Sequence, residues 1–163
     1  MLISLQTTPV YCIIKVNCGH ALMWLESRCT MTRREARESA FILIFEKEFN
    51  DSPSEELLEL AENCSEIKTD DFSKAAFAGV YDNLSEIDKT ISEYAVSWNI
   101  KRISKTALAA LRLAIYEINF VDDIPISVSI NEAVELMKKY ATKEDASFVN
   151  GILSSVAKAK ENA

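Results

Sequence analysis

The chain has 163 residues, of which 48% are hydrophobic and 26% charged, and its formal net charge is −7. These proportions are ordinary for a globular protein, and the length suffices for one domain or for two small subdomains on a shared core. The acidic balance argues against non-specific binding to nucleic acid, because phosphates repel an acidic surface. A nucleic-acid site would therefore need a local basic cluster or a partner that supplies positive charge.

The residue types exclude several other classes. Only three Gly and three Pro are present, too few for the turns of a β-sheet protein, so we predict an all-α fold. No apolar run approaches the roughly 20 residues that span a bilayer, and Lys15 interrupts the most apolar stretch of the N-terminus. We therefore expect a cytoplasmic location, where the cysteines are free thiols.

Residues 1–30 differ from the remainder in composition, with few charges and no helical periodicity. They contain the only histidine and most of the cysteines of the chain, namely Cys12, Cys18, His20 and Cys29. Zinc accepts these ligand types, but their spacing is not that of paired zinc knuckles. We favour the alternative that translation starts at Met31 and that residues 1–30 are an extension without a fold of their own.

Helical periodicity begins at the charged segment after Met31. Thr32 and Glu35 have the spacing of a capping box, which predicts the start of a helix. Its apolar stripe comprises Ala36, Ala40, Phe41, Ile44, Phe45 and Phe49. A second helix is predicted from Ser52-Pro53 to about Asn63, with proline in the first turn.

A long third helix is predicted from about Asp70 to Val96. Gly79 inside it costs about 1 kcal/mol relative to alanine, so we expect a neighbouring helix to approach closely there. After a connector at 98–102, the remaining helices are predicted at Ser104 to Phe120, Ser127 to Tyr140, and from 143–145 to Lys160. Pro125 favours a turn over 121–125.

Three blocks in residues 103–156 combine helical periodicity with polar or small residues that packing alone would not select. They are Ala110-Leu111-Arg112-Leu113-Ala114-Ile115-Tyr116-Glu117, Ile130-Asn131-Glu132-Ala133-Val134-Glu135-Leu136 and Phe148-Val149-Asn150-Gly151-Ile152-Leu153. For Tyr116, Asn131, Glu132 and Asn150 we expect an internal hydrogen-bond network between helices, because buried polar groups need partners. For Gly151 we expect a close helix contact.

In this order and spacing, the blocks resemble the C-terminal half of the NusB family. Arg33, Arg34 and Arg37 resemble the arginine-rich start of the first helix in that family. The resemblance covers residues 31–163 and implies an all-α fold of about six helices in two three-helix bundles packed on a shared core. We expect residues 31–98 and 99–163 to form the N-terminal and C-terminal subdomains.

The resemblance implies a transcription antitermination factor. NusB proteins pair with the ribosomal protein NusE, and the pair binds the boxA element of nascent single-stranded RNA. Bound there, they help transcribing RNA polymerase to pass terminators, notably on ribosomal RNA operons. The resemblance allows either a monomer or a homodimer. The alternative is a helical protein-interaction module without direct RNA binding, which the acidic balance favours.

The resemblance also indicates RNA-binding residues. A short cluster such as Arg33, Arg34 and Arg37 is by itself also consistent with a solvated helix start, whereas its match to the family favours phosphate binding. Glu35 stands at a position that is often basic in the family, and this removes one positive charge.

Phe148 has two interpretations. Periodicity alone favours a core phenylalanine, whereas the family's aromatic at this position implies a base-stacking residue. Ser147 departs from the family pattern, because it replaces a lysine that could meet a phosphate. Lys101, Arg102 and Lys105 form a second basic cluster, for which solvation and RNA contact are both consistent with the sequence.

An enzyme would need a convergent nucleophile, an acid–base pair or a metal. Residues 31–163 contain no histidine, a single cysteine (Cys64) and no glycine-rich phosphate loop. We therefore predict that the chain is not an enzyme and uses no cofactor or metal.

Overall fold

A computed structural model describes residues 31–64, 67–95 and 98–162. Within these ranges there are seven α-helices, one short 3-10 helix and no strand, which confirms the all-α prediction. The elements are α1 (Arg33–Lys47), α2 (Ser54–Cys64), α3 (Asp71–Asp82), α4 (Leu84–Tyr94), η1 (Ile100–Arg102), α5 (Lys105–Phe120), α6 (Ile126–Tyr140) and α7 (Lys143–Glu161). The predictions for residues 1–30, including the cysteine and histidine ligands, lie outside the described residues.

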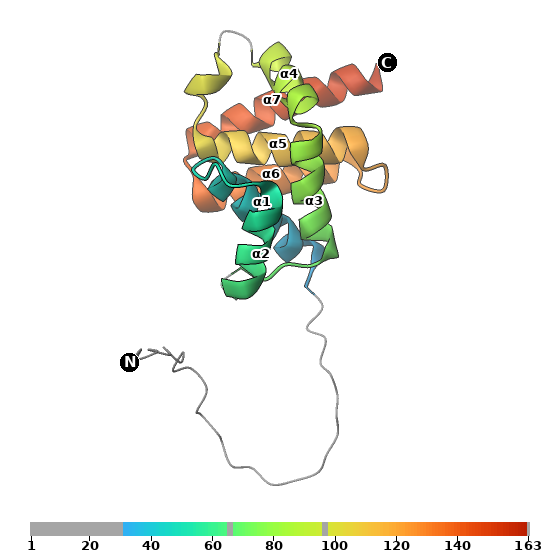
Figure 1. Cartoon of the computed structure of the whole chain (residues 1–163). Coiled ribbons are helices and arrows are strands. Elements are labelled where there is room, and N and C mark those ends of the chain that lie inside the picture. Colours follow the sequence, from blue (N-terminus) through green and yellow to red (C-terminus); the bar gives the residue numbers. More distant parts are fainter. Residues whose placement is uncertain (1–30, 65–66, 96–97, 163) are drawn as a thin grey trace, which may run out of the picture.

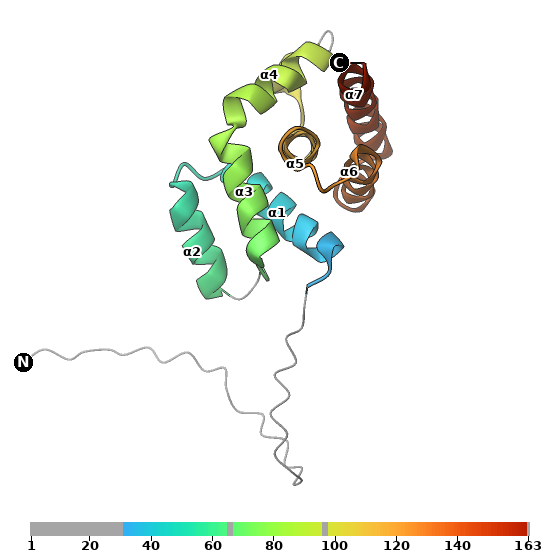
Figure 2. The ribbon, with the colours of Figure 1, turned by 90° about the vertical axis from the view of Figure 1, so that its right-hand side faces the viewer.

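Helix α5 is the centre of the fold. It contacts α1, α3, α4, α6 and α7, and Figure 2 shows it along its axis with α3 and α4 to one side and α6 and α7 to the other. Helix α2 lies outside this arrangement and packs on α1 and α3 (Figure 1). One hydrophobic cluster runs through the helices on both sides of α5, so the two halves expected from the sequence share a core.

The composition of α5 explains its central position. Eleven of its sixteen residues are buried, which a helix can tolerate only if other helices cover nearly its whole circumference. Alanines at 107, 109, 110 and 114 are among them, and small side chains allow neighbouring helices to approach closely. None of the helices in the described ranges combines the length and the apolar character that crossing a membrane requires.

The predicted helix starts depend on local hydrogen bonds that the structure contains. The Thr32 hydroxyl accepts from the N–H of Glu35, and the Glu35 carboxylate accepts from the N–H of Thr32, which completes the capping box. Ser104 caps α5 by accepting from the N–H of Ala107. Thr142 and Asp145 form a further capping box at the start of α7.

The prediction of one long helix over residues 70–96 is wrong, because the helix breaks at Asn83 into α3 and α4. The Asn83 side-chain amide donates to the carbonyl oxygen of Gly79 at 2.8 Å, and its backbone N–H donates to the same oxygen at 3.2 Å. Asn83 has a ψ angle of 17°, outside the helical range. An asparagine side chain that competes for backbone groups in this way favours helix ends over helix interiors.

One apolar position of the first stripe was also assigned wrongly. Phe49, predicted to face the core, lies beyond the end of α1 and is 69% exposed. It contacts Phe45 edge to face, with ring centroids 5.1 Å apart. The helical period of apolar residues therefore continues two residues past the helix itself.

The two glycines of the described helices have opposite surroundings. A Cβ atom at Gly79 would collide with the Tyr116 ring, so this glycine allows α5 to approach α3 as the sequence predicted. A Cβ atom at Gly151 would meet nothing within 4 Å, so the predicted close helix contact at Gly151 is wrong.

This contrast gives a matched pair of substitutions. Gly79→Val is expected to lower the free energy of unfolding by about 2 kcal/mol, because Tyr116 must move in a packed site. Gly151→Ala is expected to raise it by about 0.5–1 kcal/mol, because alanine favours an exposed helix and meets no obstacle. Urea denaturation of both variants and the wild type measures these changes. A Gly79→Val variant as stable as the wild type would contradict the close α3–α5 contact.

Candidate nucleic-acid interface

The three arginines of α1 have different environments. Arg33 is exposed and its guanidinium lies over the Phe72 ring, 4.5 Å from the ring centroid, a distance at which the cation attracts the ring face. The side chain of Arg34 is 63% exposed, whereas that of Arg37 is only 8% exposed. Of these three arginines, two are therefore surface cations and the third, Arg37, is a buried cation.

Arg37 forms a buried ion pair with Glu117 of α5. Its Nε donates to one Glu117 carboxylate oxygen at 2.7 Å, and the Ser129 hydroxyl of α6 donates to the other at 2.7 Å. The three residues therefore join α1, α5 and α6 in the core. Arg37, which the sequence placed with the phosphate-binding residues, is turned away from solvent and neutralised, so its position suits a structural role.

Arg34 is held by acidic side chains of α6. Its nitrogens lie 3.6 Å from a Glu132 carboxylate oxygen and 3.4 Å from one of Glu135. One turn further along α1, Glu38 accepts from Lys139 and Tyr140, and these hydrogen bonds lower the pKa of Glu38 below its ordinary value. A phosphate that approached Arg34 would have to compete with two carboxylates.

The second basic cluster lies on η1 and the first turn of α5. The Asn99 side chain caps η1 by accepting from the N–H of Lys101 at 2.9 Å, which fixes the turn that carries Lys101 and Arg102. Both side chains are exposed. The Lys105 ammonium donates to Glu48 at 2.8 Å, so part of its charge is neutralised within the chain.

Glu48 also belongs to a second ion-pair group that stabilises this end of the molecule. Arg112 of α5 donates to both carboxylate oxygens of Asp88 of α4, at 2.8 and 2.9 Å, and it also contacts Glu48. The side chain of Arg112 is nearly buried. The end of α1, the middle of α4 and the first half of α5 are therefore fixed relative to one another.

Phe148 is half-buried in the structure. It packs against the hydrophobic core, and the Trp98 ring contacts it in a tilted arrangement, with centroids 5.5 Å apart and an angle of 58° between the rings. Phe148 thus agrees in part with both predictions from the sequence: it packs on the core, as a core phenylalanine does, and it is partly exposed, as a base-stacking residue must be. Trp98, which is 53% exposed, was predicted only as part of a connector.

The internal network predicted for the polar residues of the C-terminal helices is wrong. Asn131 and Asn150 are exposed, and Glu132 and Tyr116 are half-buried. Glu132 is within salt-bridge distance of Arg34, and the Tyr116 ring stacks on Phe120 with centroids 5.8 Å apart. The buried network that does join helices consists of Arg37, Glu117 and Ser129.

Among the predicted RNA-binding residues, the basic side chains that remain exposed lie near the two ends of α1. Arg33 and Arg34 lie at its start, whereas Lys105 pairs with Glu48 just after its end. Because α1 has 15 residues and rises 1.5 Å per residue, these ends are about 20 Å apart. Single-stranded nucleic-acid sites span roughly 4–16 nucleotides, so one strand is long enough to contact both clusters.

Three further side chains near these residues were not predicted as part of the site. Lys139 and Tyr140 end α6 beside Glu38 of α1, and the Ser104 hydroxyl lies 3.4 Å from Asp145 at the start of α7. The sequence feature that could have indicated Lys139 and Tyr140 is a tyrosine that follows two lysines at the end of a predicted helix. The exposed surface thus combines cations with aromatic rings on an all-helical frame, a combination suited to binding a strand with unstacked bases.

These features place the protein in the class of small all-helical proteins with a mixed basic and aromatic surface. Residues 34–158 match the model of the NusB family. The chain belongs to this family, which the sequence resemblance had indicated.

Relatives and solved structures agree with this assignment. The transcription antitermination protein NusB of Acetivibrio thermocellus is 46% identical over 137 residues, which cover 80% of this chain and 91% of that protein. The structure of T. maritima NusB is 40% identical, with a TM-score of 0.69 over 78% of this chain and 91% of that one. A structure of antitermination factors NusB and NusE in complex with dsRNA is 28% identical, with a TM-score of 0.70 over 78% of this chain and 96% of that one.

Proposed function

We propose that this chain is a transcription antitermination factor that binds boxA-type RNA together with the ribosomal protein NusE and acts on transcribing RNA polymerase. The observation that carries the proposal is membership of the NusB family over residues 34–158, since a solved relative is a complex of NusB and NusE with RNA. The exposed Arg33, Arg34, Lys101 and Arg102 support it, because they supply the positive charge that the acidic chain as a whole lacks.

In this proposal the chain acts by binding and carries out no chemistry. Phosphates would lie near the two basic clusters, and unpaired bases near the exposed aromatic rings close to these clusters. Arg37 is left out, because its guanidinium is buried against Glu117. The proposed location is the cytoplasm, where a bacterial factor meets the nascent transcript.

The proposal predicts sequence-selective RNA binding by the full chain with NusE. We expect a boxA-like RNA to bind about tenfold more tightly than a scrambled RNA of the same composition, because one or two base-edge contacts provide that discrimination. Fluorescence anisotropy with labelled RNA measures both affinities, and each protein alone serves as the control. Equal affinity for the two RNAs would contradict antitermination through boxA.

A helical protein-interaction module without direct RNA binding is the second candidate. The two carboxylates on Arg34 favour it, since they reduce the attraction of that arginine for phosphate. It predicts that the chain binds NusE but leaves the RNA affinity of NusE unchanged, which the same titration measures.

A further inference from the structure

Trp98 is an unusually exposed tryptophan at a defined place in the fold. It follows α4 in the sequence, and its backbone N–H donates to the carbonyl oxygen of Ala95 at 2.9 Å. Its side chain is 53% exposed. An indole left in water forgoes the stabilisation that burial of its large apolar surface would give, so a binding role would account for the exposure.

Phe148 supports this indole from the protein side. One part of Phe148 packs against the core, and the Trp98 ring contacts Phe148 at a centroid separation of 5.5 Å. The tilt of 58° between the rings is within the arrangements that aromatic pairs prefer. Trp98 is therefore the outer member of the pair, and the aromatic surface offered to solvent belongs mainly to Trp98.

Two exposed cations lie on the turn that follows Trp98 in the sequence. Lys101 and Arg102 follow Trp98 within four residues, are exposed, and are held by the 3-10 turn that Asn99 caps. An exposed aromatic face that is followed in the sequence by exposed cations matches the chemistry of a nucleotide in a single strand, in which the base stacks and the phosphate is neutralised. A base inside a duplex has both faces covered and could not stack in this way.

We propose that Trp98 is a base-stacking residue for single-stranded RNA and that Phe148 is its support. The proposal rests on the RNA binding proposed above and adds a residue and a strand preference to it. An aromatic face accepts every base, because each base has a π surface. Trp98 therefore contributes affinity and leaves the selection of sequence to other residues.

Affinity measurements on the full chain with NusE test this role. Trp98→Leu is expected to weaken binding of single-stranded RNA about tenfold, by the same factor for boxA-like and scrambled strands, and to leave binding of a duplex unchanged. Trp98→Tyr retains a flat ring and is expected to stay within about threefold of the wild type. A melting curve for each variant establishes that the fold is intact.

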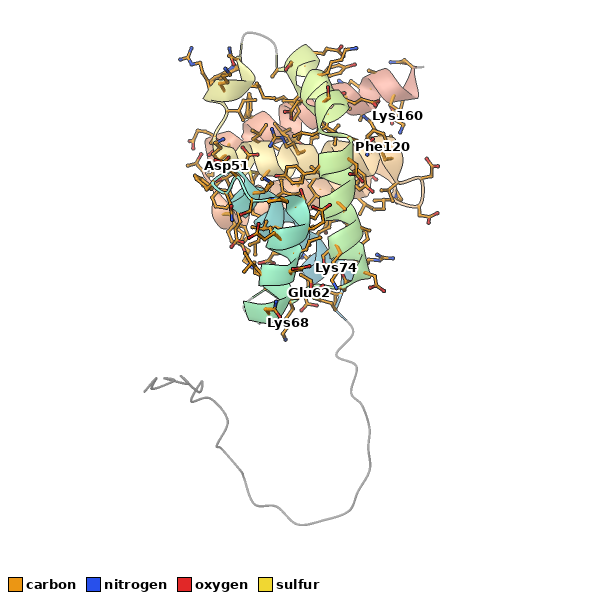
Figure 3. The ribbon with its side chains drawn as sticks, in the orientation of Figure 1. Asp51, Glu62, Lys68, Lys74, Phe120 and Lys160 are labelled. Carbon is orange, nitrogen blue, oxygen red and sulfur yellow. The ribbon has the colours of Figure 1, made fainter. Side chains whose placement is uncertain are left out.

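Phe120 provides the matched control. It is also an exposed aromatic residue stacked on a second ring, that of Tyr116, but it lies at the other end of α5 from η1 (Figure 3). Phe120→Leu is expected to leave all RNA affinities unchanged. An equal loss of affinity in Phe120→Leu and Trp98→Leu would overturn the proposal, because it would indicate a general effect of removing an aromatic ring.

Fluorescence of Trp98 tests stacking directly, without a comparison of RNA affinities between variants. The chain has two tryptophans, Trp24 and Trp98, so the emission of Trp98 is the difference between Trp24→Phe and Trp24→Phe/Trp98→Phe. Stacking on a base is expected to quench this emission when single-stranded RNA is added, and duplex RNA is expected to leave it unchanged.

The outcomes separate this inference from the proposed function. If the wild-type complex binds RNA while Trp98→Leu binds equally well, or while Trp98 emission does not change, the stacking role is wrong and the proposed function stands. If the wild-type complex binds no RNA, both are wrong. Weakened NusE binding by Trp98→Leu without RNA would also overturn the stacking role, because it would place a protein partner on the ring.

Discussion

Replacing Arg37 by methionine is expected to lower the free energy of unfolding by about 3–5 kcal/mol, the cost of leaving a buried charge without its partner. The affected charge is the Glu117 carboxylate, which is 2% exposed and would keep only the hydrogen bond from Ser129. Urea denaturation followed by circular dichroism measures the change. The double variant Arg37→Met/Glu117→Leu is expected to recover part of the stability, because it removes both charges.

Arg34→Met is the control for this experiment. Arg34 is only three residues away and also pairs with carboxylates, but its side chain is 63% exposed, and exposed ion pairs contribute about 0–1 kcal/mol. The two arginines should also differ in RNA binding: Arg34→Met is expected to weaken it, and folded Arg37→Met to leave it unchanged. A stable Arg37→Met variant with reduced RNA affinity would restore Arg37 to the RNA-binding residues.

The second large effect is expected from reversing the charges on η1. Lys101→Glu/Arg102→Glu should weaken RNA binding at least about tenfold at low salt, because attraction to two phosphates is replaced by repulsion. For single-stranded RNA the slope of log affinity against log salt should fall by about 0.7 for each phosphate that the variant no longer neutralises. A titration at several salt concentrations measures both quantities.

Lys158→Glu/Lys160→Glu is the matched control, since it changes the net charge by the same amount at the far end of α7 (Figure 3). It is expected to weaken RNA binding only slightly, through the net charge. If both double variants bound RNA with the same reduced affinity, the loss in Lys101→Glu/Arg102→Glu would be explained by the change in net charge. Lys101 and Arg102 would then not contact the RNA.

The sequence predicted those parts of the fold that depend on local interactions. The capping box at Thr32 and the cap at Ser104 involve residues three apart, so their spacing was sufficient. The break at Asn83 was missed because the apolar period continues across it, with Val80, Ile87 and Ile91 all buried. The decisive interaction there is the hydrogen bond from the Asn83 side chain to the Gly79 carbonyl oxygen, and the spacing of apolar residues gives no information about this bond.

The candidate site was less predictable because exposure depends on distant partners. Arg34 and Arg37 are similar in sequence context, whereas the partner of Arg37 in the core, Glu117, lies 80 residues further along the chain. Trp98 was missed for a related reason: a lone tryptophan in a connector shows no periodicity, and its relation to Phe148 depends on how the connector and α7 meet. Sequence alone therefore could not separate the exposed members of the site from the buried ones.

The central position of α5 has a consequence for folding. Residues before α5 cannot form a complete core alone, since α1, α3 and α4 each bury their apolar faces against it, and the same holds for α6 and α7. Such non-local packing links the stability of one half to that of the other. We therefore expect one cooperative unfolding transition, in which the arginines at the start of α1 and the rings at Trp98 and Phe148 become disordered together.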